Sequence, residues 1–115
     1  MRLFGRRKGR RRGTLRAASP TDIAHLTDFV KTRPGVEAYL EPRTTVTETT
    51  VVLIAASGEW TRRRVAGAEG AREFARKHGV PLYDAGVVGY PQRMRDWNAK
   101  RKAGGDLRRP PGTSS

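Results

Sequence analysis

The sequence predicts an α+β domain, in which an antiparallel sheet of three or four strands carries two helices on one face. Two observations predict this fold. Thr44–Val65 is rich in β-branched residues and contains a Ser57–Gly58 turn, which is typical of a β-hairpin. Apolar residues at helical spacing precede and follow that segment. The expected order is α-β-β-β-α-β, and short links between consecutive strands favour an antiparallel meander.

The first helix is expected at Pro20–Arg33. Ser19 suits the N-cap, and Pro20 suits the first helical position, where its missing N–H is not needed. The apolar residues of this helix recur at helical spacing and are Ile23, Leu26, Phe29 and Val30. The alternating residues of Val36–Glu41 then predict a strand.

The hairpin supplies the next two strands. Thr45–Ala55 is expected to form the first, because its first half alternates and its second half is apolar, as in a strand that crosses the middle of a sheet. Gly58 tolerates the positive φ of a tight turn, and the chain is expected to return through Glu59–Val65.

The remainder of the chain predicts one more helix, an edge strand and a terminal helix. Ala68–His78 has helical spacing, and Gly79 stands just past its end. Val80–Tyr83 and Val87–Tyr90 are short strand candidates, or one bent strand at a sheet edge. Pro91–Lys102 is expected to form a short helix.

The formal net charge of +13 is unevenly spread over the 115 residues. Residues 1–18 contain eight Arg or Lys and no acid, residues 19–97 contain eleven bases and ten acids, and residues 98–115 contain five bases and one acid. We therefore expect a single, nearly neutral domain at 19–97. A basic, disordered arm (1–18) precedes it, and a basic, Pro/Gly-rich tail (98–115) follows it.

Composition excludes several classes of protein. The chain has no cysteine, so disulfides, thiol nucleophiles and thiolate metal sites are excluded. No apolar run approaches the roughly 18 residues of a transmembrane helix. The basic N-terminus lacks the apolar segment of a signal peptide. A cytoplasmic location is expected.

The segment Gly5–Gly13 (GRRKGRRRG) is the strongest charge signal, with six positive side chains in nine residues. Such segments bind phosphate backbones by counterion release and forked Arg contacts. They predict nucleic-acid binding, with RNA or the ribosome favoured over DNA, through Arg6, Arg7, Lys8, Arg10, Arg11 and Arg12. The alternative is a solubilising or membrane-skimming segment without a dedicated partner.

On the returning hairpin strand, Trp60, Arg62 and Arg64 fall on one face, because side chains alternate along a strand. An exposed Trp beside two Arg residues would form a platform for base stacking and phosphate binding. The alternative is that Trp60 lies in the core or covers the sheet edge. The Arg residues would then be solvated or paired with Glu37, Glu41 or Glu48.

The end of the expected domain combines aromatic, Met and Arg side chains, which suits an interaction surface. These residues are Tyr90, Arg93, Met94, Arg95 and Trp97. The alternative is that Tyr90, Met94 and Trp97 only pin the C-terminal segment to the sheet.

No enzyme is expected. Residues 86–89 (GVVG) match neither the dinucleotide-binding nor the P-loop pattern, and no Ser/His/acid set stands at a recognisable spacing. His25 and His78 are the only histidines, which are too few for a metal site. We therefore expect neither a metal nor another cofactor.

Three segments, EPRTTVTETTVVLIAASGEWTRRRV, GAREFARKHGVPLYD and GYPQRMRDW, resemble small actinobacterial proteins of unassigned function, some of which carry an oxidoreductase name. The order α-β-β-β-α is also similar to that of double-stranded-RNA-binding domains, which use a Lys cluster at the start of the second helix. Residues 68–72 (AEGAR) have one Arg and an acid there, so this similarity is limited to topology.

The sequence thus predicts a small, non-enzymatic accessory protein that binds RNA or the ribosome through the basic arm and the Trp/Arg face of the hairpin. A protein–protein interaction module with incidental basic segments is the second hypothesis. The third is an enzyme, as the oxidoreductase name of the resembling proteins implies.

Overall fold

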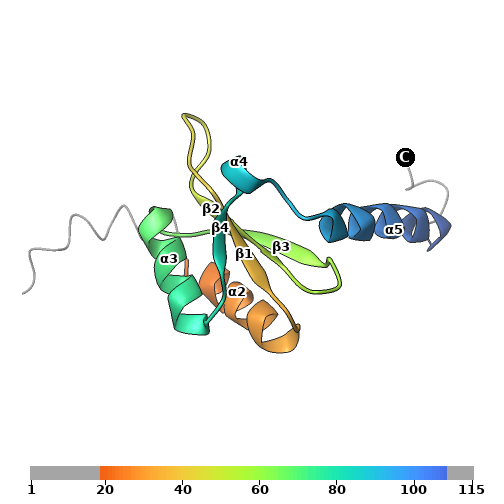
Figure 1. Ribbon diagram of the computed structural model, residues 1–115, viewed down its shortest axis with the longest axis horizontal. Coiled ribbons are helices and arrows are strands. Elements are labelled where there is room, and N and C mark those ends of the chain that lie inside the picture. The colour runs from red at the N-terminus through yellow and green to blue at the C-terminus, as the bar shows by residue number, and fades with distance from the viewer. Residues whose placement is uncertain (1–18, 109–115) are drawn as a thin grey trace, which may run out of the picture.

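The computed structural model describes residues 19–108, which form a sheet with helices on both sides (Figure 1). The elements are α2 (Pro20–Thr32), β1 (Glu37–Glu41), β2 (Thr50–Ile54), β3 (Trp60–Arg64), α3 (Gly67–His78), β4 (Leu82–Asp84), α4 (Ala85–Val88) and α5 (Gln92–Arg108). The α+β class and the order α-β-β-β-α-β are confirmed. The predicted phosphate-binding residues Arg6 to Arg12 lie outside the described residues.

The four strands lie in the order β3-β2-β1-β4. β1 pairs with β2 and β2 with β3 in antiparallel fashion, as the meander predicted. β4 instead runs parallel to β1, with Tyr83 opposite Tyr39, so the sheet is mixed and not wholly antiparallel. The physical reason is the helix α3, which carries the chain from β3 to the opposite sheet edge. A strand reached from β3 through such a crossover runs parallel to β3, and β1 has the same direction as β3 because both are antiparallel to β2.

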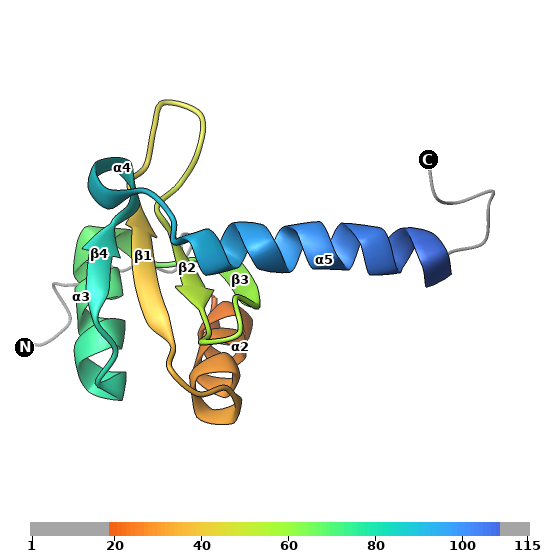
Figure 2. The ribbon, with the colours of Figure 1, turned by 45° about the vertical axis from the view of Figure 1, so that its right-hand side comes forward.

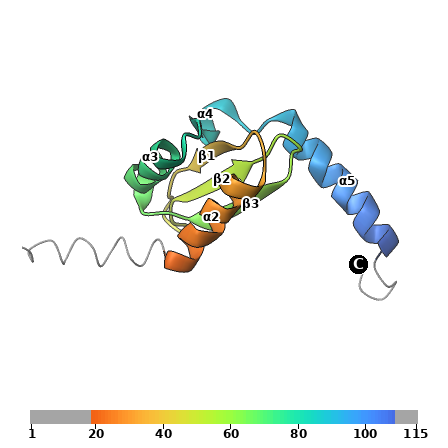
Figure 3. The same ribbon diagram turned by 90° about the horizontal axis from the view of Figure 1, so that it is seen from below.

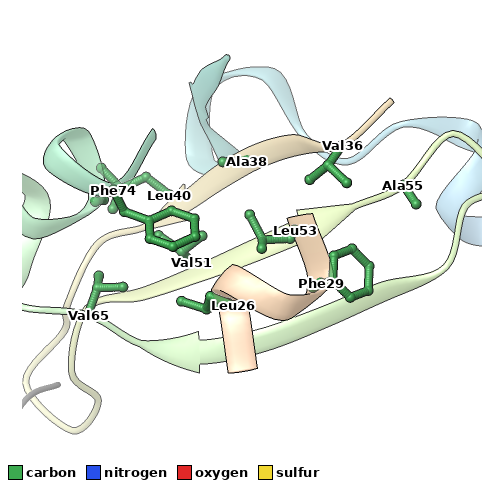
Figure 4. Close-up of a cluster of buried hydrophobic side chains, with 11 residues drawn as sticks. Leu26, Phe29, Val36, Ala38, Leu40, Val51, Leu53, Ala55, Val65 and Phe74 are labelled. Atoms are coloured by element: carbon green, nitrogen blue, oxygen red, sulfur yellow. The ribbon is translucent and has the colours of Figure 1, made fainter. Parts of the chain in front are cut away.

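One face of the sheet packs against α2 and α3, as predicted (Figure 2). α2 contributes Leu26 and Phe29, three residues apart, and β2 contributes the alternate residues Val51 and Leu53 (Figure 4). The cluster also contains Val36, Ala38, Leu40, Ala55, Val65, Ala71 and Phe74. Ile23, the first apolar residue of the expected stripe, is exposed.

The ends of both helices follow their sequence signals. The Ser19 hydroxyl accepts a hydrogen bond from the Asp22 amide at 3.0 Å, which caps the first turn of α2. Gly79 ends α3 with a left-handed φ of 65°.

The long hairpin strand Thr45–Ala55 is shorter than predicted, since β2 begins only at Thr50. The Thr44 hydroxyl accepts hydrogen bonds from the amides of Val46 (3.2 Å) and Thr47 (3.1 Å). Threonine side chains thus satisfy the backbone locally and compete with strand pairing. The first half of the predicted strand is a loop that projects beyond the sheet (Figure 2).

The strand prediction at Val87–Tyr90 is wrong, because residues 85–88 form the helical turn α4. The Asp84 carboxylate accepts a hydrogen bond from the Gly86 amide at 2.8 Å and so caps that turn. Gly89 then ends α4 at a positive φ of 72°.

The terminal helix is longer than predicted, because α5 continues past Lys102 to Arg108 and into the expected tail. Its first turns lie on the sheet face opposite α2 and α3, and the remainder extends away from the domain (Figure 3).

Gly58 lies where the start of α5 contacts the hairpin turn. It is buried and has a φ of +97°, which L-residues rarely adopt. A Cβ there would stand 2.1 Å from the Arg93 carbonyl oxygen and 3.0 Å from the Trp97 Cβ. The close approach of α5 to the turn therefore requires glycine.

Gly58→Ala is expected to lower the free energy of unfolding by about 2–5 kcal/mol, because backbone strain and the clash with α5 add. The matched control is Gly79→Ala. Gly79 also has a positive φ, but nothing lies within 4 Å of its added Cβ, so strain alone applies and the cost is about 1–2 kcal/mol. Urea unfolding of the two variants measures the difference, and equal losses would contradict tight docking of α5.

Candidate functional site

The face of the sheet opposite α2 and α3 carries a second, smaller apolar cluster. Tyr39, Val52 and Ile54 from the sheet and Met94 from α5 are buried there. Trp60, Ala85 and Tyr90 pack against them and are partly buried. Tyr90 and Met94, predicted as an interaction surface, thus attach the C-terminal segment to the sheet.

Glu41 is the centre of a polar network at the edge of this cluster. Its carboxylate accepts two hydrogen bonds from Arg62, Nε to Oε1 at 2.8 Å and Nη2 to Oε2 at 3.0 Å. The hydroxyls of Thr50 (2.5 Å) and Tyr90 also donate to it. One side chain of β1 therefore links β2, β3 and the segment before α5.

The environment of this network favours the charged carboxylate. Burial alone would raise the pKa of Glu41, but the hydrogen bonds from Arg62, Thr50 and Tyr90 outweigh it and lower that pKa below 4.5. Burial, and then the hydrogen bond to Glu41, raise the pKa of Tyr90 above 10, so its hydroxyl stays a donor. The network is fully formed at neutral pH.

Trp60, Arg62 and Arg64 share one face of β3, but two of them are engaged within the domain. The Trp60 indole Nε1 donates to Asn98 Oδ1 of α5 at 2.7 Å. The Arg62 guanidinium lies 5.3 Å from the Trp60 ring centroid while it pairs with Glu41. Arg64 is exposed. The interpretation in which these Arg residues pair with Glu37, Glu41 or Glu48 therefore matches the position of Arg62.

Arg93 has a similar internal role. Its Nη2 lies 2.6 Å from Glu37 Oε1, and its Nε donates to the Ala55 carbonyl at 2.9 Å. The Tyr39 hydroxyl donates to the same Glu37 oxygen at 3.2 Å. Arg93 thus fastens the first turn of α5 to two strands. Arg95, by contrast, is exposed and donates to Gln92 Oε1 at 3.2 Å.

A groove lies between α5 and the hairpin turn, with a volume of about 410 Å³. Its lining residues are Ser57, Trp97, Lys100, Arg101 and Gly104. The last four share one face of α5, because residues three, four and seven apart lie above one another on a helix. Trp97 is partly buried, whereas Lys100 and Arg101 are exposed.

The three consecutive bases Lys100, Arg101 and Lys102 are exposed, and they form no ion pair with the side chains described for residues 19–104. Most arginines of the domain differ in this respect, because Arg33, Arg62, Arg63, Arg72, Arg76 and Arg93 each face a carboxylate. These bases therefore place three positive charges, without a carboxylate partner among residues 19–104, at consecutive positions on the projecting part of α5.

A second hollow, of about 340 Å³, lies under the loop that precedes β2. Its polar lining includes the carboxyls of Glu41 and Glu48, the guanidinium of Arg62 and the hydroxyls of Thr44, Thr47 and Thr50. Within the described part of the chain, no three His, Cys, Asp or Glu side chains are placed to hold a metal ion.

Trp97 was predicted as a site residue, but the rest of the groove was not, since the domain was expected to end at that residue. The signal is the spacing of Trp97, Lys100, Arg101 and Gly104 in a segment with helical propensity. Ser57 could not be placed there, because its proximity depends on how α5 docks.

Comparison with family models, with curated proteins and with solved structures gave no match for this chain. The resemblances to actinobacterial proteins and to double-stranded-RNA-binding domains therefore stay predictions. Among residues 19–108, none of the helices has the length and apolar character needed to cross a membrane.

Glu41→Gln is expected to lower the free energy of unfolding by about 1–3 kcal/mol at pH 7, because the charged acceptor of three donors is lost. The folded-state pKa of Glu41 is depressed, so its contribution is present above the unfolded value of 4.5 and disappears as the pH falls through the folded value. The difference between wild type and variant should therefore shrink on acidification below pH 4.5.

Urea unfolding at several pH values measures this difference. Glu73→Gln is the matched control, since Glu73 pairs with Arg76 at 3.3 Å on the exposed surface of α3 and such pairs contribute less than about 1 kcal/mol. Equal effects of the two substitutions at pH 7 would show that the Glu41 network does not hold the sheet together.

Proposed function

We propose that this protein is a small, non-enzymatic accessory protein that binds nucleic acid, with RNA or the ribosome as the favoured partner. The phosphate contacts are assigned to the arm residues Arg6, Arg7, Lys8, Arg10, Arg11 and Arg12 and to the exposed bases of α5. The observation that carries the proposal is the projection of α5 from the domain with Lys100, Arg101 and Lys102 exposed (Figure 3).

Electrostatics supports this assignment. Arginines that already share a carboxylate gain little from a phosphate, because the first partner must be displaced. Lys100, Arg101 and Lys102 have no such partner among the side chains described for residues 19–104 and can release counterions from a phosphate backbone. The eight bases of residues 1–18, which face no acid in their own segment, add to the same effect.

In this proposal, Trp60 and Arg62 of the hairpin have a structural role and do not contact the nucleic acid. Trp60 and Arg62 bind Asn98 and Glu41, so they orient α5 on the sheet. Arg64 keeps the predicted role of a phosphate contact, since it is exposed at the end of β3.

A protein-interaction module is the second candidate, and one observation favours it. Val87 and Val88 of α4 are 80% and 57% exposed, beside Tyr83 on the edge strand β4. Exposed apolar side chains next to an unpaired strand edge suit a protein partner. In this version the basic segments are incidental.

The test is a fluorescence-anisotropy titration of the full chain with RNA and DNA at 50 and 200 mM salt. Affinity is expected to fall on the order of a thousandfold across that range if six or more phosphates are engaged. Replacing the six arm bases by Gln, in the full chain, should remove most of that salt dependence. Binding without salt dependence, or none at all, would contradict the proposal.

Lys100→Gln with Lys102→Gln tests the contribution of α5. This pair should weaken binding about tenfold or more and reduce the salt slope by about one to two, because two phosphate contacts are lost. Arg72→Gln with Arg76→Gln removes the same charge from α3, whose bases already pair with Glu69 and Glu73. Equal weakening by both pairs would indicate a general effect of net charge and no site on α5.

A further inference from the structure

The groove between α5 and the hairpin turn combines an aromatic ring with two cations. Trp97 forms one part of it, Lys100 and Arg101 follow on the next helical turn, and Ser57 stands opposite on the hairpin turn. Its volume of about 410 Å³ lies in the range of small-molecule pockets, roughly 300–1,000 Å³. One nucleotide unit is a group of suitable size and chemistry.

We propose that this groove binds single-stranded nucleic acid, with one base stacked on the Trp97 indole and the adjoining phosphate held by Lys100 and Arg101. This inference rests on the proposed function and names the form of nucleic acid that the site takes. Stacking on an aromatic side chain requires a base whose face is free, which a single strand offers and an intact duplex does not.

The helical segment that carries Trp97 is held against the hairpin before any ligand arrives. The Trp97 Cβ packs against the backbone of Gly58, and the next residue, Asn98, accepts the Trp60 indole hydrogen bond at 2.7 Å. The backbone at Trp97 therefore needs no rearrangement when a ligand binds, which favours affinity.

Gly104 keeps the far end of the groove open. A Cβ at that position would meet nothing within 4 Å, so the space beside the helix is free for a ligand. The same fact makes Gly104 a position where a larger side chain fills the groove without disturbing the packing of the domain.

The carboxylate of Glu59 acts on Arg101 but does not compete with a phosphate. Arg33 donates two hydrogen bonds to Glu59, Nε to Oε1 at 3.1 Å and Nη2 to Oε2 at 2.8 Å. These bonds first, and the charge of Arg101 to a smaller degree, lower the pKa of Glu59. Because Arg33 already neutralises Glu59, Arg101 stays available for an anion.

The experiment titrates the full chain with oligoadenylate, with the duplex that oligoadenylate forms with oligouridylate, and with an oligoglutamate peptide. Anisotropy reports affinity, and tryptophan emission reports stacking. The chain has two tryptophans, so Trp97→Phe leaves Trp60 as the reporter of unspecific effects. Oligoadenylate should quench the wild type strongly and the Trp97→Phe variant weakly, and the duplex should quench neither.

Two substitutions test the groove by opposite routes. Trp97→Leu should weaken oligoadenylate binding about tenfold, as the loss of one base stack does, and leave duplex binding unchanged. Gly104→Leu should have the same effect by filling the groove, with all charges retained. Gly104→Ala is its control, since it raises helix propensity without filling the space and should bind as the wild type does.

Three results would overturn the inference. If oligoadenylate binds but neither Trp97→Leu nor Gly104→Leu weakens it, the groove is not the site, although the proposed function stands. If oligoglutamate quenches Trp97 and binds as tightly as oligoadenylate, the groove takes an acidic protein segment. If the full chain binds neither nucleic acid, the inference and the proposed function fail together.

Discussion

The structure depends on the burial of two faces of one small sheet. The first face is covered by α2 and α3, whose apolar residues pack against Leu53 and its neighbours. The second face exposes Tyr39, Val52 and Ile54 unless another element covers them, and only the segment from α4 to the first turns of α5 does so within the described residues. Met94 completes that small core.

The polar contacts around this second core have one consequence in common, which is the direction of α5. Glu41 holds Tyr90 and Arg62, Glu37 holds Arg93, and Asn98 holds Trp60. Three of these contacts join a strand to the C-terminal segment, and the Arg62 pair stabilises Glu41, to which Tyr90 donates. Once the first turns are fixed, α5 extends away from the sheet (Figure 2), and Lys100, Arg101 and Lys102 are exposed.

Much of this fold could be predicted from the sequence, because its signals are local. Ser19 and Gly79 mark helix ends, Gly58 marks the hairpin, and Val51–Ile54 is apolar throughout. The direction of β4 could not be predicted, since it depends on where a crossover helix returns the chain. Nor could the start of β2, because the Thr44 hydroxyl accepts hydrogen bonds from backbone amides that would otherwise pair in the sheet.

The candidate site was predicted only in part, for a physical reason. The alternation of Trp60, Arg62 and Arg64 was visible, but their partners Asn98 and Glu41 are distant in sequence and meet only through docking. The charge of residues 98–102 was visible too, and was assigned to a tail because the domain was expected to end at Trp97. Composition thus located the positive charge, and tertiary packing decided which bases remain without a carboxylate.

The most direct measurement of the central claim is a heteronuclear NMR titration of the isotope-labelled full chain with a single-stranded oligonucleotide. The Trp97 indole signal and the amides of residues 97–104 are expected to shift, while the Trp60 indole signal, hydrogen-bonded to Asn98, is expected to stay in place. Shifts confined to Tyr83, Val87 and Val88, or to residues 1–18 alone, would contradict the central claim.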